Sequence, residues 1–376
     1  MAGYLISLSD EESLNTLVSA GLYSTHMASP SNNQWMAFHE GTFADYLSMK
    51  EGDYIFFFVK RKIYGCGILV NIGDDCKYFN YTDAGVPSGH KSKNYSETHL
   101  LPNGAKENRC FCTFEPCPAF FKHGVDMDEV LQNKDNPFRS IRTFWKLSFI
   151  KMDDDESQAL YNVIMKSNEE VIGDKREHYA FDKSKQKKIA RLVSYKYLMQ
   201  RQFLIQSCRS NDRLKHEMAL EASMCEMLTK EDIEPFGHWD YVSHQVIASP
   251  FKPIDYMDKM DIFGYKYIQG YKQYKIKSKY LIAELKKDEA TVDIVEQIMK
   301  YVDWVSNEYA NKDYSMIEAY IVAADFSDEV KELAREHCVR NFTKGYRPTE
   351  FCVWKALKMV KYKVDDEDVH FSLVSY

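Results

Sequence analysis

The chain has 376 residues, which is long for one ordinary domain and predicts two. Its composition, 45% hydrophobic and 28% charged, is typical of a soluble globular protein, and no apolar run approaches the roughly 20 residues that a membrane helix needs. The net charge of −7 gives no overall electrostatic signal for nucleic-acid binding, although a local basic groove is compatible with it.

The N-terminus and the cysteines predict a cytoplasmic protein. Residues 1–5 lack the basic start and the long apolar core of a signal peptide. The nine cysteines are odd in number and scattered, which indicates reduced core residues rather than a disulfide framework. Cys110, Cys112 and Cys117 have the spacing of a zinc half-site, but no fourth ligand follows at a matching spacing, so buried cysteines are favoured.

Short strand patterns fill the first part of the chain. Residues 3–8 predict an opening strand, and residues 9–12 offer an N-cap with acids in the first turn of a helix. The clearest pattern is an apolar strand over residues 54–59, which we expect to pair in a hairpin with residues 63–70. Residues 84–108 are polar and rich in turn formers, so they predict a long surface loop.

A closing strand is predicted over residues 144–150, followed by the acidic run at residues 153–156. Acids in the first turn of a helix complement its dipole. The acidic run therefore predicts a helix start rather than a metal site.

Three of these segments resemble the EVE, YTH and wider PUA-like family of small β-barrels: GDYIFFFV, YGCGILV and FWKLSFIKMDDDE. The resemblance implies a barrel with flanking helices over residues 1–165 that reads a modified base in an aromatic-walled pocket. It implies Trp35, Phe57 and Tyr64 as pocket residues. Ordinary barrel core is the alternative for Phe57 and Tyr64, whereas the polar stretch before Trp35 favours base stacking.

Residues 166–214 predict a helical connector with a basic bias. The basic side chains of this region and its edge are Lys183, Lys185, Lys187, Lys188, Arg191, Lys196, Arg201, Arg209, Arg213 and Lys215. A charge run of this kind is usually a solvated helix face. In a net-acidic protein it is equally a candidate track for a phosphate backbone.

The remaining residues, 215–376, carry the chemistry. Their patterns predict, in order, a helix, three strands, a helix, a strand and a helix, over about 215–228, 241–247, 260–265, 280–286, 294–305, 317–324 and 327–338. Glu284 and Lys286 are two residues apart and so share one face of their strand. An acid and a base at the end of an otherwise buried strand are costly without a purpose. A simple surface ion pair is the alternative.

This order resembles the core of the PD-(D/E)XK nucleases, and the similarity is closest to the NucS-like branch. The residues that carry it are Asp261, Glu284-Leu285-Lys286, Gln297 with Tyr301, Glu217-x-x-Leu220-Glu221, and His244-Gln245. The resemblance implies a restriction-endonuclease-like α/β domain. The whole chain is then an α/β protein with a PUA-like barrel, a connector and a nuclease domain.

The resemblance implies a site for Mg²⁺, with Mn²⁺ as an alternative, held by Asp261, Glu284 and Glu217. Hard cations of this kind prefer carboxylate oxygens. Glu221 lies on the same helix face as Glu217, four residues away, and is the alternative helix acid.

Catalytic roles follow from the same resemblance. Lys286 would orient the attacking water and stabilise negative charge, and its pKa should fall if burial and the metal disfavour its charge. Gln297 and Tyr301 would position Lys286 or a phosphate.

The sequence therefore predicts a metal-dependent endodeoxyribonuclease acting on double-stranded DNA. The N-terminal domain implies modification-dependent restriction or antiviral defence. A mismatch- or structure-specific repair endonuclease and a non-catalytic nucleic-acid-binding protein remain alternatives, and RNA remains open as the substrate. Because two cuts on a duplex favour two-fold symmetry, we expect a homodimer.

Overall fold

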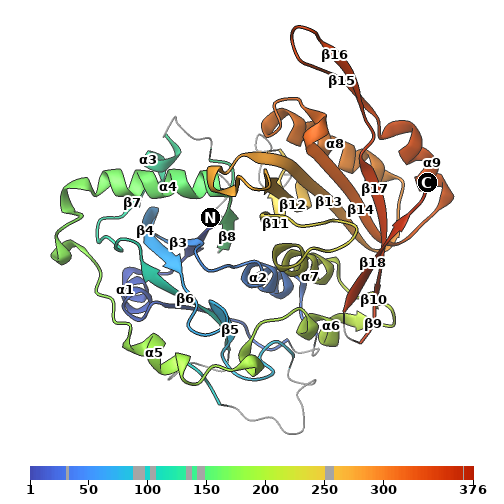
Figure 1. The fold of residues 1–376 in the computed structure, drawn as a ribbon. Coiled ribbons are helices and arrows are strands. Elements are labelled where there is room, and N and C mark those ends of the chain that lie inside the picture. Colours follow the sequence, from blue (N-terminus) through green and yellow to red (C-terminus); the bar gives the residue numbers. More distant parts are fainter. Residues whose placement is uncertain are drawn as a thin grey trace. The chain divides into compact units, whose positions relative to one another are not determined.

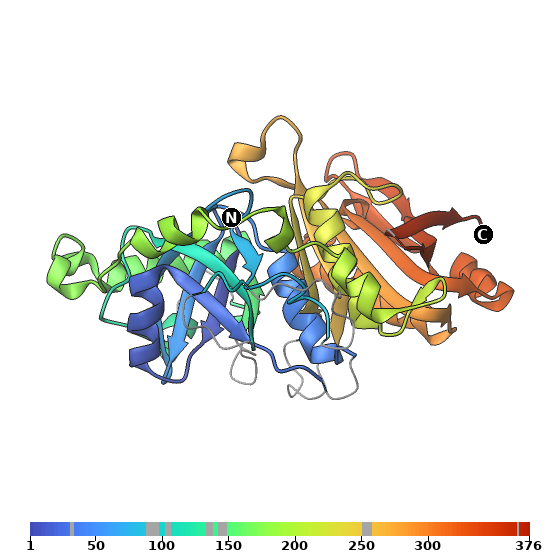
Figure 2. The same cartoon turned by 90° about the horizontal axis from the view of Figure 1, so that it is seen from below.

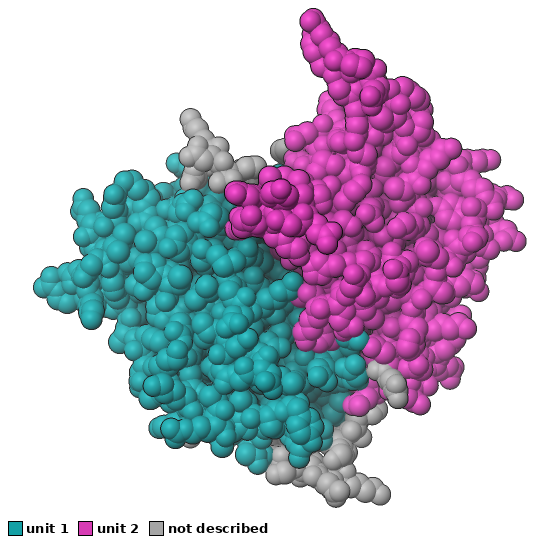
Figure 3. Space-filling model, viewed as in Figure 1, with its two compact units in different colours: residues 1–203 teal, residues 204–376 magenta. Residues whose placement is uncertain are grey.

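The computed structural model describes residues 1–30, 34–87, 98–101, 107–132, 138–141, 149–249, 258–366 and 368–376. They form two compact units, Met1–Phe203 and Leu204–Tyr376, coloured separately in Figure 3. Both units combine helices with a sheet, which confirms a mixed α/β protein. No helix of the described part is long and apolar enough to cross a membrane. The division into a reader, a connector and a nuclease domain stays a prediction.

The first unit is built on one curved sheet with the strand order β2-β6-β4-β3-β1-β8, to which β5 adds beside β6 and β7 beside β4. Figure 1 and Figure 2 show it from two sides. Its elements are β1 (Gly3–Ser7), α1 (Glu11–Ala20), β2 (Leu22–His26), α2 (Ala37–Leu47), β3 (Tyr54–Val59), β4 (Lys62–Leu69), β5 (Lys77–Phe79), β6 (Asn108–Pro116), β7 (Val125–Asp126), α3 (Met127–Leu131), β8 (Phe149–Met152), α4 (Asp154–Ser167) and α5 (Ser184–Ala190). Helix α6 (Gln202–Cys208) contains the boundary between the units.

Several local predictions for this unit are confirmed. The Asp10 side chain caps α1 by accepting from the Ser13 amide at 2.7 Å. The predicted hairpin forms between β3 and β4, and its turn residues Lys60 and Arg61 both have positive φ, as tight hairpin turns require. Asp153 caps α4, so the acidic run is a helix start.

Other predictions fall partly outside the described residues. These include most of the expected surface loop over 84–108 and residues 144–148 of the expected closing strand, whose end is β8. Within the described part, the edge strands β2 and β8 do not pair with each other, so a closed barrel is not confirmed. All nine cysteines are free. Seven of them, including Cys110 and Cys112 of β6, are buried and are confirmed as core residues, whereas Cys117 and Cys352 are half-buried.

The second unit contains a six-stranded sheet with the order β11-β12-β13-β14-β17-β18, in which β13, β14 and β17 are parallel. Its elements are β9 (Arg209–Ser210), β10 (Arg213–Leu214), α7 (Glu217–Lys230), β11 (Tyr241–Ile247), β12 (Lys259–Tyr267), β13 (Lys277–Ala290), α8 (Asp293–Glu308), β14 (Ile317–Phe326), α9 (Asp328–His337), β15 (Arg340–Lys344), β16 (Glu350–Trp354), β17 (Leu357–Val364) and β18 (Val369–Val374). The predicted succession from α7 to α9 is confirmed. The β15–β16 hairpin, which the sequence did not predict, projects from the unit (Figure 1).

The alternation of side chains along β13 divides its two faces. Leu281, Ala283 and Leu285 join the core cluster that contains the apolar side of α7. Glu284 points to the opposite face, where it meets Gln297 of α8. The strand is thus covered on both sides, and its acid is buried between sheet and helix.

Candidate active site

Two buried carboxyl groups form the centre of the candidate site. Asp261 on β12 and Glu284 on β13 lie just beyond the last register pair of the two strands, Ile262 with Ala283. Asp261 is 8% exposed and Glu284 is 1% exposed. The Asp261 Oδ2 atom accepts a hydrogen bond from the Leu285 amide at 2.8 Å, which ties the β12 carboxylate to β13. The two carboxyl groups are close enough for Asp261 to act directly on the charge of Glu284.

Burial and mutual repulsion disfavour negative charge on this pair. Burial, and then the charge of Glu221, raise the pKa of Asp261 to about 7. Burial, and then the neighbouring Asp261, raise the pKa of Glu284 to about 9. Two acids this close require either a shared proton or a cation between them.

The donor set fits a hard divalent cation. Oε2 of Glu284 is buried, and no group in the described part of the chain donates a hydrogen bond to it. A buried carboxylate oxygen without a donor is costly unless a cation or proton contacts it. Carboxylate oxygens are the ligands that Mg²⁺ and Mn²⁺ prefer, so Asp261 and Glu284 could hold either ion.

Lys286 and Glu217 stand at the edge of the carboxyl pair. The Lys286 Nζ atom lies 3.3 Å from Oε1 of Glu217 and 3.6 Å from Oε1 of Glu284. Burial lowers the pKa of Lys286, but the carboxylates of Glu217, Glu284 and Asp261 outweigh burial and raise it. The predicted fall of this pKa depends on a bound metal as well as on burial and stays a prediction; without a metal, three acids surround the ammonium group and raise its pKa. Lys286 is a cation here.

Gln245 connects the first helix to the carboxyl pair, a role that the sequence did not assign. In the β11–β12 ladder His244 pairs with Ile262 and Val246 with Met260, which leaves Gln245 unpaired with φ +51. Its side-chain amide donates to both oxygens of Glu221 at 3.0 Å and to Oδ1 of Asp261 at 3.2 Å. A strained residue that contacts two buried acids is typical of a functional site.

The two candidate helix acids have different roles in this arrangement. Glu217 is in the first turn of α7, and it accepts from the Lys286 ammonium and, at 3.4 Å, from the Lys287 amide. Glu221 is buried and reaches Asp261 through Gln245. The structure therefore brings both acids close to Asp261 and Glu284. Glu217 contacts Lys286 directly, whereas Glu221 is linked to Asp261 through the side chain of Gln245. We call Asp261, Glu284, Glu217 and Glu221 the carboxyl cluster.

Gln297 and Tyr301, one turn apart on α8, fix the orientation of Glu284. The Gln297 Nε2 atom donates to Oε1 of Glu284 at 2.6 Å and contacts the Tyr301 hydroxyl at 3.0 Å. The Tyr301 hydroxyl donates to the Lys259 carbonyl at 2.9 Å. Burial raises the pKa of Tyr301, which keeps its hydroxyl protonated. The prediction placed these side chains against Lys286 or a phosphate, whereas here Gln297 contacts the carboxylate of Glu284 and Tyr301 contacts Gln297.

The three aromatic residues predicted to bind a base are buried in the first unit. Trp35 is fully buried, and its indole N–H donates to the Gly85 carbonyl at 2.8 Å. Phe57 and Tyr64 are register partners on β3 and β4, and both are buried. Base reading by these residues stays a prediction.

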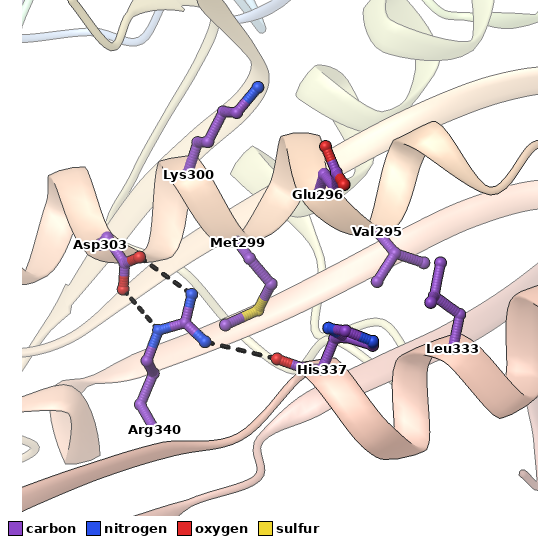
Figure 4. A pocket seen from close by; sticks show the side chains of 8 residues that line it. All are labelled: Val295, Glu296, Met299, Lys300, Asp303, Leu333, His337 and Arg340. Carbon is purple, nitrogen blue, oxygen red and sulfur yellow. Dashed lines mark hydrogen bonds and ion pairs between the residues drawn. The ribbon is translucent and has the colours of Figure 1, made fainter.

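A separate cavity of about 280 Å³ lies between α8 and α9 (Figure 4). Val295, Met299 and Leu333 give it apolar walls. Asp303 and Arg340 close one side through a two-point ion pair, with contacts of 2.8 and 2.9 Å. None of the residues that line this cavity belongs to the carboxyl cluster.

Among known proteins, similarity to this chain is found only with solved structures and not with family models or curated proteins. No family model matches the sequence, and no curated protein matches it. Among solved structures, the chain is similar to the crystal structure of a repair endonuclease from Pyrococcus abyssi, with 20% sequence identity and a TM-score of 0.21. The match covers 34% of this chain and 45% of that chain, so it spans less than half of that endonuclease.

Proposed function

We propose that the second unit is a metal-dependent nuclease of the PD-(D/E)XK type that hydrolyses phosphodiester bonds of DNA. The observation that supports this most directly is the buried pair of Asp261 and Glu284 with the Lys286 ammonium beside it. A structural pair would place an acid beside a base, whereas this site places two acids beside each other. Mg²⁺ or Mn²⁺ would be held by Asp261 and Glu284, with Glu217 as a further carboxylate.

The bound cation would neutralise phosphate charge and make a coordinated water more acidic. The chain's own residues supply the other requirements of hydrolysis. Lys286 is positively charged and partly exposed, so it can donate to a phosphate oxygen or to the attacking water. Gln297 holds Glu284, and Gln245 holds Asp261, so each acid is oriented before substrate arrives.

The proposal is tested by incubating the full chain with Mg²⁺ and closed circular DNA. Cutting of a circle demonstrates endonuclease activity, because a circle has no ends. Parallel reactions on unmodified, methylated and mismatched duplexes, and on RNA, separate modification-dependent restriction from repair. If the folded protein cuts none of them with Mg²⁺ or Mn²⁺, the nuclease proposal is wrong, and the non-catalytic alternative takes its place.

Gln297→Leu is expected to lower cleavage by about 10- to 100-fold and to raise the Mg²⁺ concentration needed for half-maximal rate. Loss of a side chain that orients a metal-binding carboxylate usually has an effect of this size. The measurement is the initial cleavage rate as a function of Mg²⁺ concentration.

The matched control for this variant is Asn307→Leu, because Asn307 is an exposed amide on the same helix that contacts only the backbone of Asp303 in the described structure. It should behave as the unaltered protein. Equal Mg²⁺ dependence of Gln297→Leu and the control would show that Gln297 does not position Glu284.

A further inference from the structure

A polar cleft of about 480 Å³ lies beside the carboxyl cluster. One wall is the β9–β10 hairpin with its turn residues Asn211 and Asp212, and the other is Lys287 with Asp288, in the second half of β13. Arg213 and Lys215 also line it. The candidate active site does not use these side chains.

Both walls are held in place by hydrogen bonds to β17. The Val364 amide donates to the Asp212 carbonyl at 2.8 Å, and the Tyr362 hydroxyl donates to the Lys287 carbonyl at 2.6 Å. The hairpin turn itself is tight, with Asn211 at φ +59. A ligand entering the cleft would therefore meet walls that are already positioned, which reduces the entropy lost on binding.

Two positively charged side chains of the cleft, those of Arg213 and Lys215, have N–H groups available to bind a ligand. Arg213 lies 3.7 Å from Asp288 and 4.0 Å from Asp212, too far for hydrogen bonds, and its side chain is 45% exposed. Within the described residues, the Lys215 ammonium has no ion-pair partner, whereas Lys287 pairs with Asp288 at 3.1 Å. Three cations face two carboxylates, so the cleft carries an excess positive charge. A guanidinium with free donors beside a lysine is suited to a phosphate.

The cleft adjoins the carboxyl cluster through the chain itself. Lys287 follows Lys286, and its backbone amide donates to Oε2 of Glu217, whose other oxygen contacts the Lys286 ammonium. A nucleic-acid strand carries a phosphate on every nucleotide. A strand with one phosphate at the carboxyl cluster would therefore bring a neighbouring phosphate to the adjacent cleft.

We propose that the cleft formed by Arg213, Lys215 and Lys287 binds a backbone phosphate of the substrate strand, next to the phosphate that is hydrolysed. This inference rests on the proposed nuclease function and adds a site for strand positioning. Its contacts are to the sugar-phosphate backbone and are independent of base sequence.

The test measures binding, so that it does not depend on cleavage. The full chain carrying Glu284→Gln is titrated with a labelled duplex DNA at several salt concentrations, with and without the double change Arg213→Ala and Lys215→Ala. Loss of the contacts to this one phosphate is expected to weaken binding and to reduce the slope of log K against log salt by about 0.9, the contribution of one neutralised phosphate. Both side chains are exposed, so the fold should be retained.

The matched control replaces an exposed lysine and an exposed arginine elsewhere in the unit, Lys300→Ala with Arg335→Ala. If the cleft variant and this control show the same affinity and slope while the unaltered protein still cleaves DNA, the phosphate site is wrong and the nuclease function stands. If the Glu284→Gln protein binds no duplex and the unaltered protein cleaves none, both fail. In the catalytically intact protein, the cleft variant should raise KM more than it lowers kcat.

Discussion

Glu284→Gln is expected to lower the rate of DNA cleavage by roughly 1000-fold or more, and Lys286→Ala by roughly 100- to 1000-fold, while both leave the fold unchanged. Glutamine keeps the shape of Glu284 and its contact with Gln297, but it removes the charge that would hold the cation. Alanine at position 286 removes the cation beside the reacting phosphate, and the loss of one such electrostatic contact costs roughly 100- to 1000-fold. Single-turnover cleavage rates with saturating Mg²⁺ measure both effects, and circular dichroism checks the fold.

Two variants serve as controls for this prediction. Glu289→Gln changes an exposed acid on the same strand, and Lys300→Ala changes an exposed lysine on α8. Both should cut DNA at the unaltered rate. Undiminished cleavage by Glu284→Gln and by Lys286→Ala would place the catalytic centre elsewhere in the chain.

The sequence was sufficient to place the main elements of this site. Leu281, Ala283 and Leu285 alternate with Glu284 and Lys286, and this period of two predicts which face of β13 is apolar core. The helical spacing of Gln297 and Tyr301 likewise predicts that they share one side of α8. Such local periodicities depend only on backbone geometry, so they can be predicted without knowledge of the tertiary structure.

Long-range contacts could not be predicted in this way. The positive φ of Gln245 is not indicated by a glycine in the sequence, and the contacts of Gln245 with Glu221 and Asp261 depend on how β11 pairs with β12. The pKa of Lys286 in the site without a metal depends on the distances to three acids from three different elements, and the sequence does not give these distances. The burial of Trp35 also depends on a long-range contact. The hydrogen-bond partner of its indole, the Gly85 carbonyl, is 50 residues away, so the polar local sequence did not predict a buried indole.

The carboxyl pair also creates a conflict between stability and function. Burying Asp261 against Glu284 destabilises the metal-free fold whenever both would be charged, and α7 adds Glu217 and Glu221 nearby. A core built for stability alone would place apolar residues at these positions. Protonation or a bound cation would offset this cost, so metal binding should be coupled to folding stability at a pH where the pair would otherwise be charged.

We expect the metal-free protein to lose thermal stability as the pH rises from about 5 to about 8, and Mg²⁺ to restore it at the higher pH. In the folded state the pKa of Glu284 is about 9, against an ordinary value of 4.5, and that of Asp261 is about 7, against 3.8. At a pH between the ordinary pKa values of these acids and their raised folded-state values, the folded state holds more protons than the unfolded state. The free energy of unfolding therefore falls with rising pH. Melting temperatures in chelator and in Mg²⁺, at several pH values, measure both effects.

The variant Glu284→Gln separates the contribution of Asp261 and Glu284 to the pH dependence of stability from that of other titrating groups. One such group is Glu156, whose pKa burial raises to about 7. Removing one acid relieves the repulsion on Asp261 and removes the carboxylate that we propose as a metal ligand. The variant should therefore melt at least about 5 °C higher than the unaltered protein in chelator near pH 8, since 1 kcal/mol shifts the melting temperature of a domain of this size by roughly 2–4 °C. It should also gain little from Mg²⁺. An identical pH dependence and an identical response to Mg²⁺ in the two proteins would mean that Glu284 is neither the strained acid nor the ligand that the geometry of Asp261, Glu284 and Lys286 indicates.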